Sequence, residues 1–265
     1  MRLEGCTAVI TGASAGIGRE FARQLAGRAG ALVLVARRVD RLEELRNELT
    51  ARDPNLNVLI RAIDLSLADD VTALAAWLGE QKISVDLLIN NAGLGDHGPF
   101  ATSEPERLMA MLAVNIAALT ALTRALLPCM IARKRGCVLN VSSSASFLPM
   151  PSLAVYAATK AYVTSLSEAL RMELRGTGVS VTALCPGPVH TEFGSVASRP
   201  NQQDQMGPEF TYVSTEEVVR AALAGVEHGH AIVVPGIVMK IAVTLLRMTP
   251  MPLLRLLAKA SPRDP

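Results

Sequence analysis

The sequence predicts an α/β fold: a doubly wound, mostly parallel sheet of about seven strands, with helices on both faces, in a Rossmann-like arrangement. Short apolar runs alternate with helix-length segments along most of the 265 residues. The runs are almost continuously hydrophobic, as in parallel strands that are covered on both faces. The segments between them are long enough for right-handed crossovers. With no repeat and no linker before residue 190, we expect one domain over residues 1–265.

The apolar runs and the periodic segments place the individual elements. Predicted strands cover residues 7–10, 31–35, 57–63, 85–90, 137–141, 179–184 and 231–234. Predicted helices cover residues 17–28, 40–50, a segment from residue 66, 105–127, 155–175 and 215–227. Ser66, with Asp69 at the capping-box partner position, and Thr215 are the expected N-caps of two of these helices. Pro128 and Gly176 are expected to end two others.

Composition and charge exclude several classes of protein. Half of the residues are hydrophobic and 19% are charged, which argues against disorder over most of the chain. The formal net charge is +2 and the basic residues are scattered, so a nucleic-acid partner is not indicated. The first ten residues show no secretory signal, and we expect a cytoplasmic protein.

The cysteines lie in apolar surroundings without the spacing of metal ligands. We interpret them as reduced core residues and expect no metal site. They are Cys6, Cys129, Cys137 and Cys185.

A glycine-rich turn follows the first predicted strand. Gly12, Gly16 and Gly18 are spaced G-x-x-x-G-x-G between this strand and the first helix, with Ser14 inside the turn. Glycine allows positive φ and close backbone approach, and the N-terminus of the next helix offers N–H groups to a pyrophosphate. We therefore predict a dinucleotide site, the alternative being a glycine turn that holds no ligand.

The end of the second predicted strand indicates which dinucleotide binds. An acidic residue here would accept hydrogen bonds from a ribose 2′-hydroxyl and favour NAD. Arg37 and Arg38 stand there instead, and guanidinium groups match the charge and geometry of a 2′-phosphate. NADP(H) is therefore the predicted cofactor. Arg37 carries this prediction with Arg38 in support, since we expect Arg38 rather to cap or solvate the helix start. Ser14 can donate to the same phosphate.

Tyr156 and Lys160 lie one helical turn apart, and Ser143 precedes the tyrosine by thirteen residues. Residues at i and i+4 share a helix face, so we expect the ammonium to lower the pKa of the phenol from its ordinary value near ~10. Most such pairs are surface residues, and the pattern gains meaning only beside a cofactor site. The neighbours Ser142 and Ser144 are expected to be turn residues.

In this combination and order, the motifs resemble those of the short-chain dehydrogenase/reductase family. The resemblance covers about residues 5 to 192. It implies an acid–base centre of Ser143, Tyr156 and Lys160, with Asn115 supporting a proton-relay water. The remaining cofactor positions that it implies are Ile17 in the glycine turn, Asp64 and Leu65 at the adenine, Asn91, Ala92 and Gly93 over the cofactor, and Pro186, Gly187, Val189 and Thr191 at the nicotinamide.

One residue type of the family pattern is missing here. Many NADP-preferring members carry a basic residue in the glycine turn, where this chain has Ser14 and Ala15. The expected function is NADPH-dependent interconversion of a carbonyl and an alcohol by hydride transfer. The alternative is an NADP-binding regulatory or scaffolding protein that has kept the fold without significant turnover.

Two segments are expected to govern access and association. Residues 188–214 have few periodic apolar positions, and we expect them to form a lid over the substrate. The residues expected to make the pocket apolar are Leu94, Phe147, Leu148, Met150, Phe193 and Phe210, which suits a ketone, a 3-oxoacyl group or a steroid-like substrate. His97 and His190 are interpreted as loop residues, and Pro200, Asn201, Gln202 and Gln203 as part of the lid.

Residues 236–265 form a basic amphipathic extension. Its apolar residues are Ile237, Val238, Ile241, Leu245, Leu246, Leu253, Leu254, Leu256 and Leu257, and its basic residues are Lys240, Arg247, Arg255 and Lys259. Such a segment can lie on a membrane surface, pack over the pocket, or contact a second subunit of a dimer or tetramer. This segment is interrupted too often for a membrane-spanning helix, by Lys240, Arg247, Pro250 and Pro252.

Overall fold

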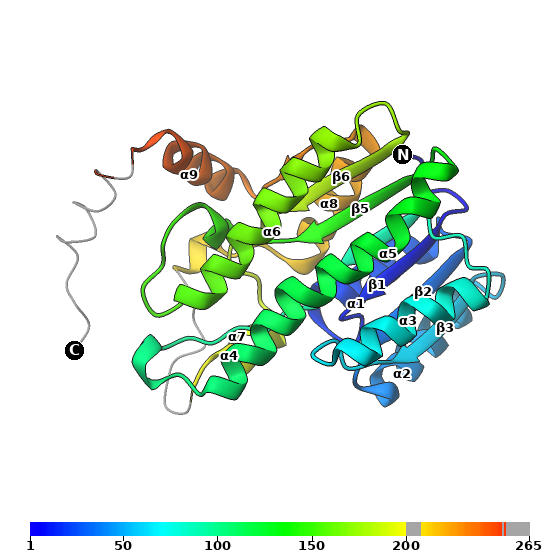
Figure 1. Cartoon of the computed structure of the whole chain (residues 1–265), viewed down its shortest axis with the longest axis horizontal. Coiled ribbons are helices and arrows are strands. Elements are labelled where there is room, and N and C mark those ends of the chain that lie inside the picture. The colour runs from blue at the N-terminus through cyan, green and yellow to red at the C-terminus, as the bar shows by residue number, and fades with distance from the viewer. Residues whose placement is uncertain (200–207, 251, 253–265) are drawn as a thin grey trace.

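A computed structural model describes residues 1–199, 208–250 and 252 of the chain. In this part a seven-stranded, all-parallel sheet runs in the order β3-β2-β1-β4-β5-β6-β7 (Figure 1). The strands are β1 (Thr7–Thr11), β2 (Ala31–Ala36), β3 (Asn57–Ala62), β4 (Leu87–Asn90), β5 (Gly136–Val141), β6 (Val179–Leu184) and β7 (Ile232–Val233). This confirms the predicted fold class, although the last strand is shorter than the predicted one.

Helices cover both faces of the sheet, as Figure 1 shows. They are α1 (Gly16–Ala26), α2 (Val39–Arg52), α3 (Ala68–Glu80), α4 (Pro105–Leu112), α5 (Leu119–Ala132), α6 (Ala154–Glu173), α7 (Glu192–Ala197), α8 (Thr215–His228) and α9 (Ile237–Met248). Short 3₁₀ turns lie at Phe100–Thr102, Ser144–Phe147 and Glu209–Thr211.

Two hydrophobic layers, one on each face, hold the sheet between the helices. Alternate residues of each strand point to opposite faces. Ile10 of β1 packs with Phe21 and Leu25 of α1 and with α2 and α8, whereas Val9 packs with Leu74 of α3 and with α5 on the other face. All of these side chains are buried, so β1 is apolar on both faces, whereas the edge strand β3 is only partly buried.

Helix ends differ from the predicted ones in three places. Helix α3 begins at Ala68, and Ser66 is not its cap, because the Ser66 hydroxyl donates to the Asp64 carboxylate at 2.7 Å. Helix α8 is capped by Ser214, whose hydroxyl accepts from the Glu217 amide, and Thr215 is already its first residue. Helix α6 ends at Glu173, three residues before Gly176.

The predicted helix over 105–127 is longer than expected and is not regular. It runs from Pro105 to Ala132 and contains one π-helical turn, Ala113–Ala118. Pro128 does not end it. The last turn beyond the proline is anchored by Met130, which is fully buried and lies so close to Gly136 that a Cβ there would be 2.7 Å from the methionine Cγ.

The same helix is long and apolar enough, by length and composition, to cross a membrane. In the described structure, however, α5 packs against β5 and α3 as part of the layer that covers the sheet. Cys129, on this helix, is exposed, which corrects its interpretation as a core residue; Cys6, Cys137 and Cys185 are buried.

The described part of the C-terminal extension is the helix α9. It contacts the Ser144–Phe147 turn, where the Arg247 guanidinium lies 5.6 Å from the centre of the Phe147 ring. Its inner face buries Val243, and its outer face leaves Ile237, Ile241 and Leu245 exposed. The predicted apolar and basic positions Leu253, Leu254, Arg255, Leu256, Leu257 and Lys259 lie outside the described residues.

Candidate active site

A cleft of about 650 Å³ opens at the carboxyl ends of β1, β4 and β5. This is where the strand order reverses, between β1 and β4, so the loops leaving these strands turn to opposite sides and leave a crevice. The cleft is lined by every residue that the sequence analysis predicted for the catalytic and cofactor sites, except Gly18 and Asn115. Residues far apart in the chain, such as Ser14 and Thr191 at a separation of 177 positions, thus share one surface.

The glycine turn forms one end of the cleft and has no room for side chains. Gly12 has φ +67, and a Cβ there would lie 2.9 Å from the Cα of Ala92. A Cβ at Gly18 would lie 2.3 Å from the Gly12 carbonyl oxygen. Gly18 therefore acts behind the cleft surface, by letting α1 pack closely against the turn.

The N-terminus of α1 meets the cleft with free polar groups. Its N-cap residue, Ala15, offers no side-chain cap, and its first turn holds no acidic residue. The first N–H groups of a helix have no partner inside the helix, and the helix dipole favours an anion there. Gly16 and Ile17 line the cleft at this point. These residues fit the pyrophosphate of a dinucleotide.

The turn after β4 is tied to the glycine turn by a small hydrogen-bond network. The Asn91 side-chain amide donates to the Thr11 and Gly12 carbonyls, at 2.9 and 3.3 Å. The Thr11 hydroxyl accepts from the amides of Asn91 and Ala92. Asn91 therefore holds two loops of the cleft together.

Around the predicted 2′-phosphate site the two arginines lie differently. Arg38 turns back across the glycine turn, where its guanidinium donates to the Ser14 hydroxyl at 3.3 Å and to the Glu192 carboxylate at 2.9 Å. Arg37 is more exposed, and its guanidinium lies 3.9 Å from the Asp64 carboxylate. Arg38 is thus the arginine that is hydrogen-bonded to Ser14, whereas the sequence predicts Arg37 as the main residue of the 2′-phosphate site.

Asp64 itself is held in place by its neighbours. Burial acts to raise the pKa of its carboxyl group, but hydrogen bonds from the Ser66 amide and hydroxyl outweigh this effect and lower the pKa below its usual range. The side chain is therefore an ionised acceptor at the edge of the cleft. Leu65, beside it, also lines the cleft.

Tyr156 and Lys160 stand in the first two turns of α6, and Ser143 lies just beyond the end of β5. The Lys160 ammonium donates to the Val141 carbonyl at 2.9 Å and lies 5.7 Å from the centre of the Tyr156 ring. The Ser143 hydroxyl accepts from the Ala145 amide at 3.1 Å. The structure thus brings the three predicted catalytic side chains together beside the cleft.

The pKa values of this centre differ from the expected pattern. Burial raises the pKa of Tyr156 to about 12, against a hydrogen bond with Ser143 that lowers it. Burial also lowers the pKa of Lys160 to about 8. The expectation that Lys160 lowers the pKa of the phenol is therefore not met in the protein alone, because desolvation disfavours both charged forms.

Asn115 lies in the π-helical turn, behind the cleft surface. Its side-chain oxygen accepts from the Leu94 amide at 2.8 Å, and its nitrogen donates to the Leu94 carbonyl at 2.9 Å and to the Thr159 hydroxyl at 3.0 Å. It is almost fully buried. Asn115 therefore braces the loop after β4 against α6, next to Lys160, and its relay role stays a prediction.

The other end of the cleft has an apolar wall that includes Phe193 of α7. The Phe193 ring lies 5.4 Å from the Tyr156 ring, and the Thr191 hydroxyl caps α7 by accepting from the Phe193 amide. Of the predicted pocket residues, Leu94, Met150 and Phe193 line the cleft, whereas Phe147, Leu148 and Phe210 do not. Residues Pro200, Asn201, Gln202 and Gln203 of the predicted lid lie outside the described residues.

Further cleft residues, among them Leu153, Glu192, Val196 and Tyr212, were not predicted individually. Glu192, Val196 and Tyr212 lie in the segment 188–214 that was predicted as a lid. His190 also lines the cleft, where it stacks on Tyr212 with ring centres 4.1 Å apart, whereas His97 pairs with Ser198 in an isolated β-bridge instead. Among the described residues, no group of three His, Cys, Asp or Glu side chains could hold a metal ion.

Comparisons with known proteins agree on one family. A sequence model described as short chain dehydrogenase matches residues 6–202. The chain is 41% identical over 196 residues to a sulfoacetaldehyde reductase of Chromohalobacter salexigens (73% of this chain, 76% of that protein). It is 33% identical over 193 residues to a very-long-chain 3-oxoacyl-CoA reductase of Rattus norvegicus (71% of this chain, 61% of that protein).

A solved structure is similar as well. It is a short-chain dehydrogenase from Sphingobium yanoikuyae in complex with NADPH, with a TM-score of 0.79 and 33% identity, and the match covers 88% of each chain. For several of the curated relatives the matched region is less than two thirds of the relative's own length.

Proposed function

This chain belongs to the short-chain dehydrogenase family, and on that premise we propose that it is an NADPH-dependent oxidoreductase that interconverts a carbonyl and an alcohol. The observation that carries the proposal is the meeting of Ser143, Tyr156 and Lys160 with the glycine turn in one cleft. A protein that only bound the cofactor would need the glycine turn and the arginines. It would have no use for a phenol, a hydroxyl and an ammonium beside the apolar wall.

The bound nicotinamide would supply the hydride. In the reductive direction the hydroxyl groups of Ser143 and Tyr156 would donate to the substrate oxygen as negative charge develops on it. Tyr156 would then give its proton to that oxygen as a general acid. Because burial keeps the pKa of the phenol at about 12, the proton is in place at neutral pH.

Lys160 would act on the tyrosine and on the cofactor. Its ammonium, now bonded to the Val141 carbonyl, would bond the nicotinamide ribose and stabilise the phenolate left after proton transfer. Asn115 would hold the neighbouring backbone so that a water can return a proton. Alcohol oxidation would use the same groups in reverse order.

The chemistry of the wall supports an apolar substrate. Leu94, Met150, Leu153, Phe193 and Val196 line the cleft, and the Phe193 ring of α7 lies 5.4 Å from the Tyr156 ring. Apolar surface of this kind favours ligands that lose water on binding. We therefore propose a ketone, a 3-oxoacyl group or a steroid-like carbonyl rather than a small anion.

A carbonyl panel with NADPH consumption as the readout tests the proposed function. The panel should include aliphatic ketones of increasing length, a 3-oxoacyl thioester, a steroid ketone and sulfoacetaldehyde. We expect turnover of at least one apolar carbonyl. NADPH binding without turnover across the panel would favour a regulatory or scaffolding protein instead.

Removal of Arg38 should change the choice of cofactor. Because a hydrogen bond to a charged group contributes roughly 1.5–3 kcal/mol, Arg38→Ala should weaken NADPH binding by at least about tenfold. NADH binding should change little. Arg37→Ala should have a smaller effect, since its side chain is more exposed and Arg38, not Arg37, donates to Ser14. Dissociation constants measured by cofactor fluorescence would check this, and equal weakening of NADPH and NADH would contradict the phosphate assignment.

Glu192 should oppose binding of a 2′-phosphate. Its carboxylate pairs with Arg38 at 2.9 Å and with Arg41 at 3.5 Å, where a phosphate would compete with it. Since exposed ion pairs are worth up to about 1 kcal/mol, Glu192→Gln should tighten binding of 2′,5′-ADP by about two- to fivefold. Calorimetry with 2′,5′-ADP and 5′-ADP would measure this, with Glu216→Gln on α8 as the matched control. A gain for 5′-ADP of the same size would contradict it.

A further inference from the structure

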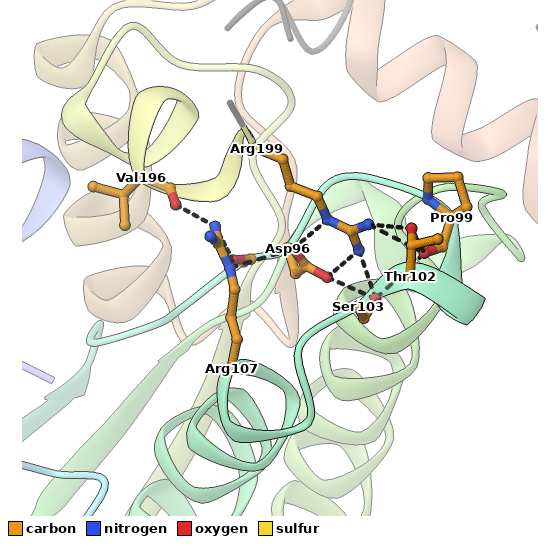
Figure 2. Close-up of polar contacts among 8 residues, drawn as sticks. Asp96, Pro99, Thr102, Ser103, Arg107, Val196 and Arg199 are labelled. Carbon is orange, nitrogen blue, oxygen red and sulfur yellow. Dashed lines mark hydrogen bonds and ion pairs between the residues drawn. The ribbon is translucent and has the colours of Figure 1, made fainter. Parts of the chain in front are cut away.

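A buried carboxylate stands at the junction of three segments near the apolar wall. Asp96 lies in the loop after β4, and its side chain is 3% exposed. The Arg199 guanidinium donates to both of its oxygens, at 3.0 and 2.6 Å, and the Arg107 guanidinium lies 3.3 Å away (Figure 2). The hydrogen bonds from Arg199 hold the pKa of Asp96 below its usual range, so the side chain stays charged. A buried charge requires such partners.

The two arginines connect the Asp96 carboxylate to α4 and to α7, the helix within the predicted lid segment 188–214. Arg199, two residues beyond the end of α7, also donates to the Pro99 carbonyl at 3.3 Å and to the Thr102 hydroxyl at 2.8 Å. Arg107, on α4, also donates to the Gly95 carbonyl and to the Val196 carbonyl of α7. Figure 2 shows the two guanidinium groups on either side of Asp96. One carboxylate thus joins the loop after β4, the start of α4 and the end of α7.

Two glycines, Gly95 and Gly98, let α7 approach the loop after β4 closely. A Cβ at Gly95 would lie 2.8 Å from the Phe193 ring and 2.9 Å from the Ala197 Cβ. A Cβ at Gly98, where φ is +152, would lie 2.5 Å from the Arg199 guanidinium carbon. The His97 amide also donates to the Ala197 carbonyl at 2.9 Å. Helix α7 therefore rests directly on the loop that Asp96 holds.

The position of Phe193 follows from this contact. Its ring lies between Gly95 and Tyr156, and it forms the wall next to the group that we propose as the general acid. We propose that Asp96 is a positioning residue: through Arg199 and Arg107 it fixes α7 so that Phe193 orients an apolar substrate at Tyr156. The expected effect on substrate kinetics rests on the proposed function. The expected anchoring of α7 rests only on the contacts described above.

Asp96→Asn tests the inference, because it removes the charge and keeps the size. Misplacement of groups around a reacting centre can cost up to ~10²-fold, so we expect kcat/KM for a ketone such as 2-decanone to fall by roughly ten- to a hundredfold. Most of the loss should be in KM. NADPH binding should change much less than KM, because the glycine turn and Arg38 are kept. Amide hydrogen exchange in residues 192–198 should become at least about tenfold faster, since α7 loses its anchor.

The chain supplies a matched control. Asp86 also pairs with two arginines, Arg135 at 3.1 Å and Arg133 at 3.9 Å, but it lies at the opposite ends of the strands. Asp86→Asn should lower stability without changing KM or the exchange of residues 192–198. A second variant, Phe193→Ala, should raise KM by itself, and its effect should not add to that of Asp96→Asn if both act through the same wall.

The outcomes separate this inference from the proposed function. Unchanged exchange of residues 192–198 in Asp96→Asn would overturn the inference, whatever the activity. Faster exchange with an unchanged KM, or fully additive effects with Phe193→Ala, would overturn its positioning role. An absence of turnover in the wild-type protein would instead count against the proposed reductase, while the exchange data would still decide whether Asp96 anchors α7.

Discussion

Tyr156→Phe should reduce kcat/KM for any accepted carbonyl by about 10³-fold or more. General acid catalysis contributes typically 10²–10⁴-fold, and the variant also removes one of the two hydroxyl groups proposed to hold the substrate oxygen. The hydroxyl is the only group lost, because the ring and its contact with Phe193 remain. Single-turnover kinetics under saturating NADPH would measure the effect on the chemical step.

The control for this prediction is cofactor binding. Tyr156→Phe keeps the glycine turn and Arg38 intact, so the dissociation constant for NADPH should stay within about twofold of the wild-type value. Tyr162, farther along α6 and bonded to the Thr120 hydroxyl at 3.0 Å, offers a matched substitution, and Tyr162→Phe should leave activity unchanged. Retained turnover in Tyr156→Phe would refute the proposed general acid.

Lys160→Met should abolish turnover and stabilise the fold. Burial lowers the pKa of Lys160 to about 8, and each pKa unit corresponds to roughly 1.4 kcal/mol, so the buried ammonium costs the folded state about 3 kcal/mol. Methionine removes that cost but leaves the Val141 carbonyl without its donor, a loss of about 1–2 kcal/mol. We expect a net gain of about 1–2 kcal/mol at pH 7, measured by urea denaturation.

The gain should depend on pH in a defined direction. Below about pH 8 the wild-type lysine carries its proton in both the folded and the unfolded chain, and the full cost of burial is present. As pH rises from about 8 towards 10.5 the folded chain has lost the proton that the unfolded chain still holds, so wild-type stability rises relative to the variant. The difference between the two proteins should therefore shrink over this range. A difference that grows with pH would contradict the assignment.

A residue that is required for activity and lowers the stability of the fold is expected at an active site. The buried Lys160 ammonium, with its lowered pKa, is unfavourable in the folded protein alone, whereas the raised pKa of Tyr156 disfavours only its phenolate form. Cofactor binding would add hydrogen-bond acceptors for the ammonium. A surface Tyr-x-x-x-Lys pair would show neither shift, because water would solvate both groups.

Most of the candidate site could be predicted because it depends on local rules. The glycines of the turn are required by close backbone approach, as the Cβ distances at Gly12 and Gly18 show. Tyr156 and Lys160 share a face of α6 because they are four residues apart. Loops that leave parallel strands at the same end of a sheet must meet, so the strand pattern places Ser14, Asn91 and Ser143 along one cleft.

The predictions that were wrong concern positions where a tertiary contact competes with a local rule. Ser66 has the chemistry of an N-cap, but the nearby Asp64 carboxylate accepts its hydroxyl hydrogen and α3 begins later. Pro128 lacks an amide hydrogen, but burial of Met130 keeps the helix going to Ala132. Arg37 and Arg38 are adjacent and chemically identical, so only the packed loops decide which one reaches Ser14.

The sequence by itself determined the α/β fold, the family and those cleft residues that belong to its motifs, because periodicity, glycine geometry and spacing act over a few residues of chain. Only the tertiary structure decided which side chains are buried together and what their charges cost. It showed that burial raises the pKa of Tyr156 to about 12, that Glu192 pairs with Arg38, and that Asp96 joins α7 to the loop after β4. Desolvation and ion pairing depend on three-dimensional surroundings that residues distant in the chain create together, and no local pattern encodes them.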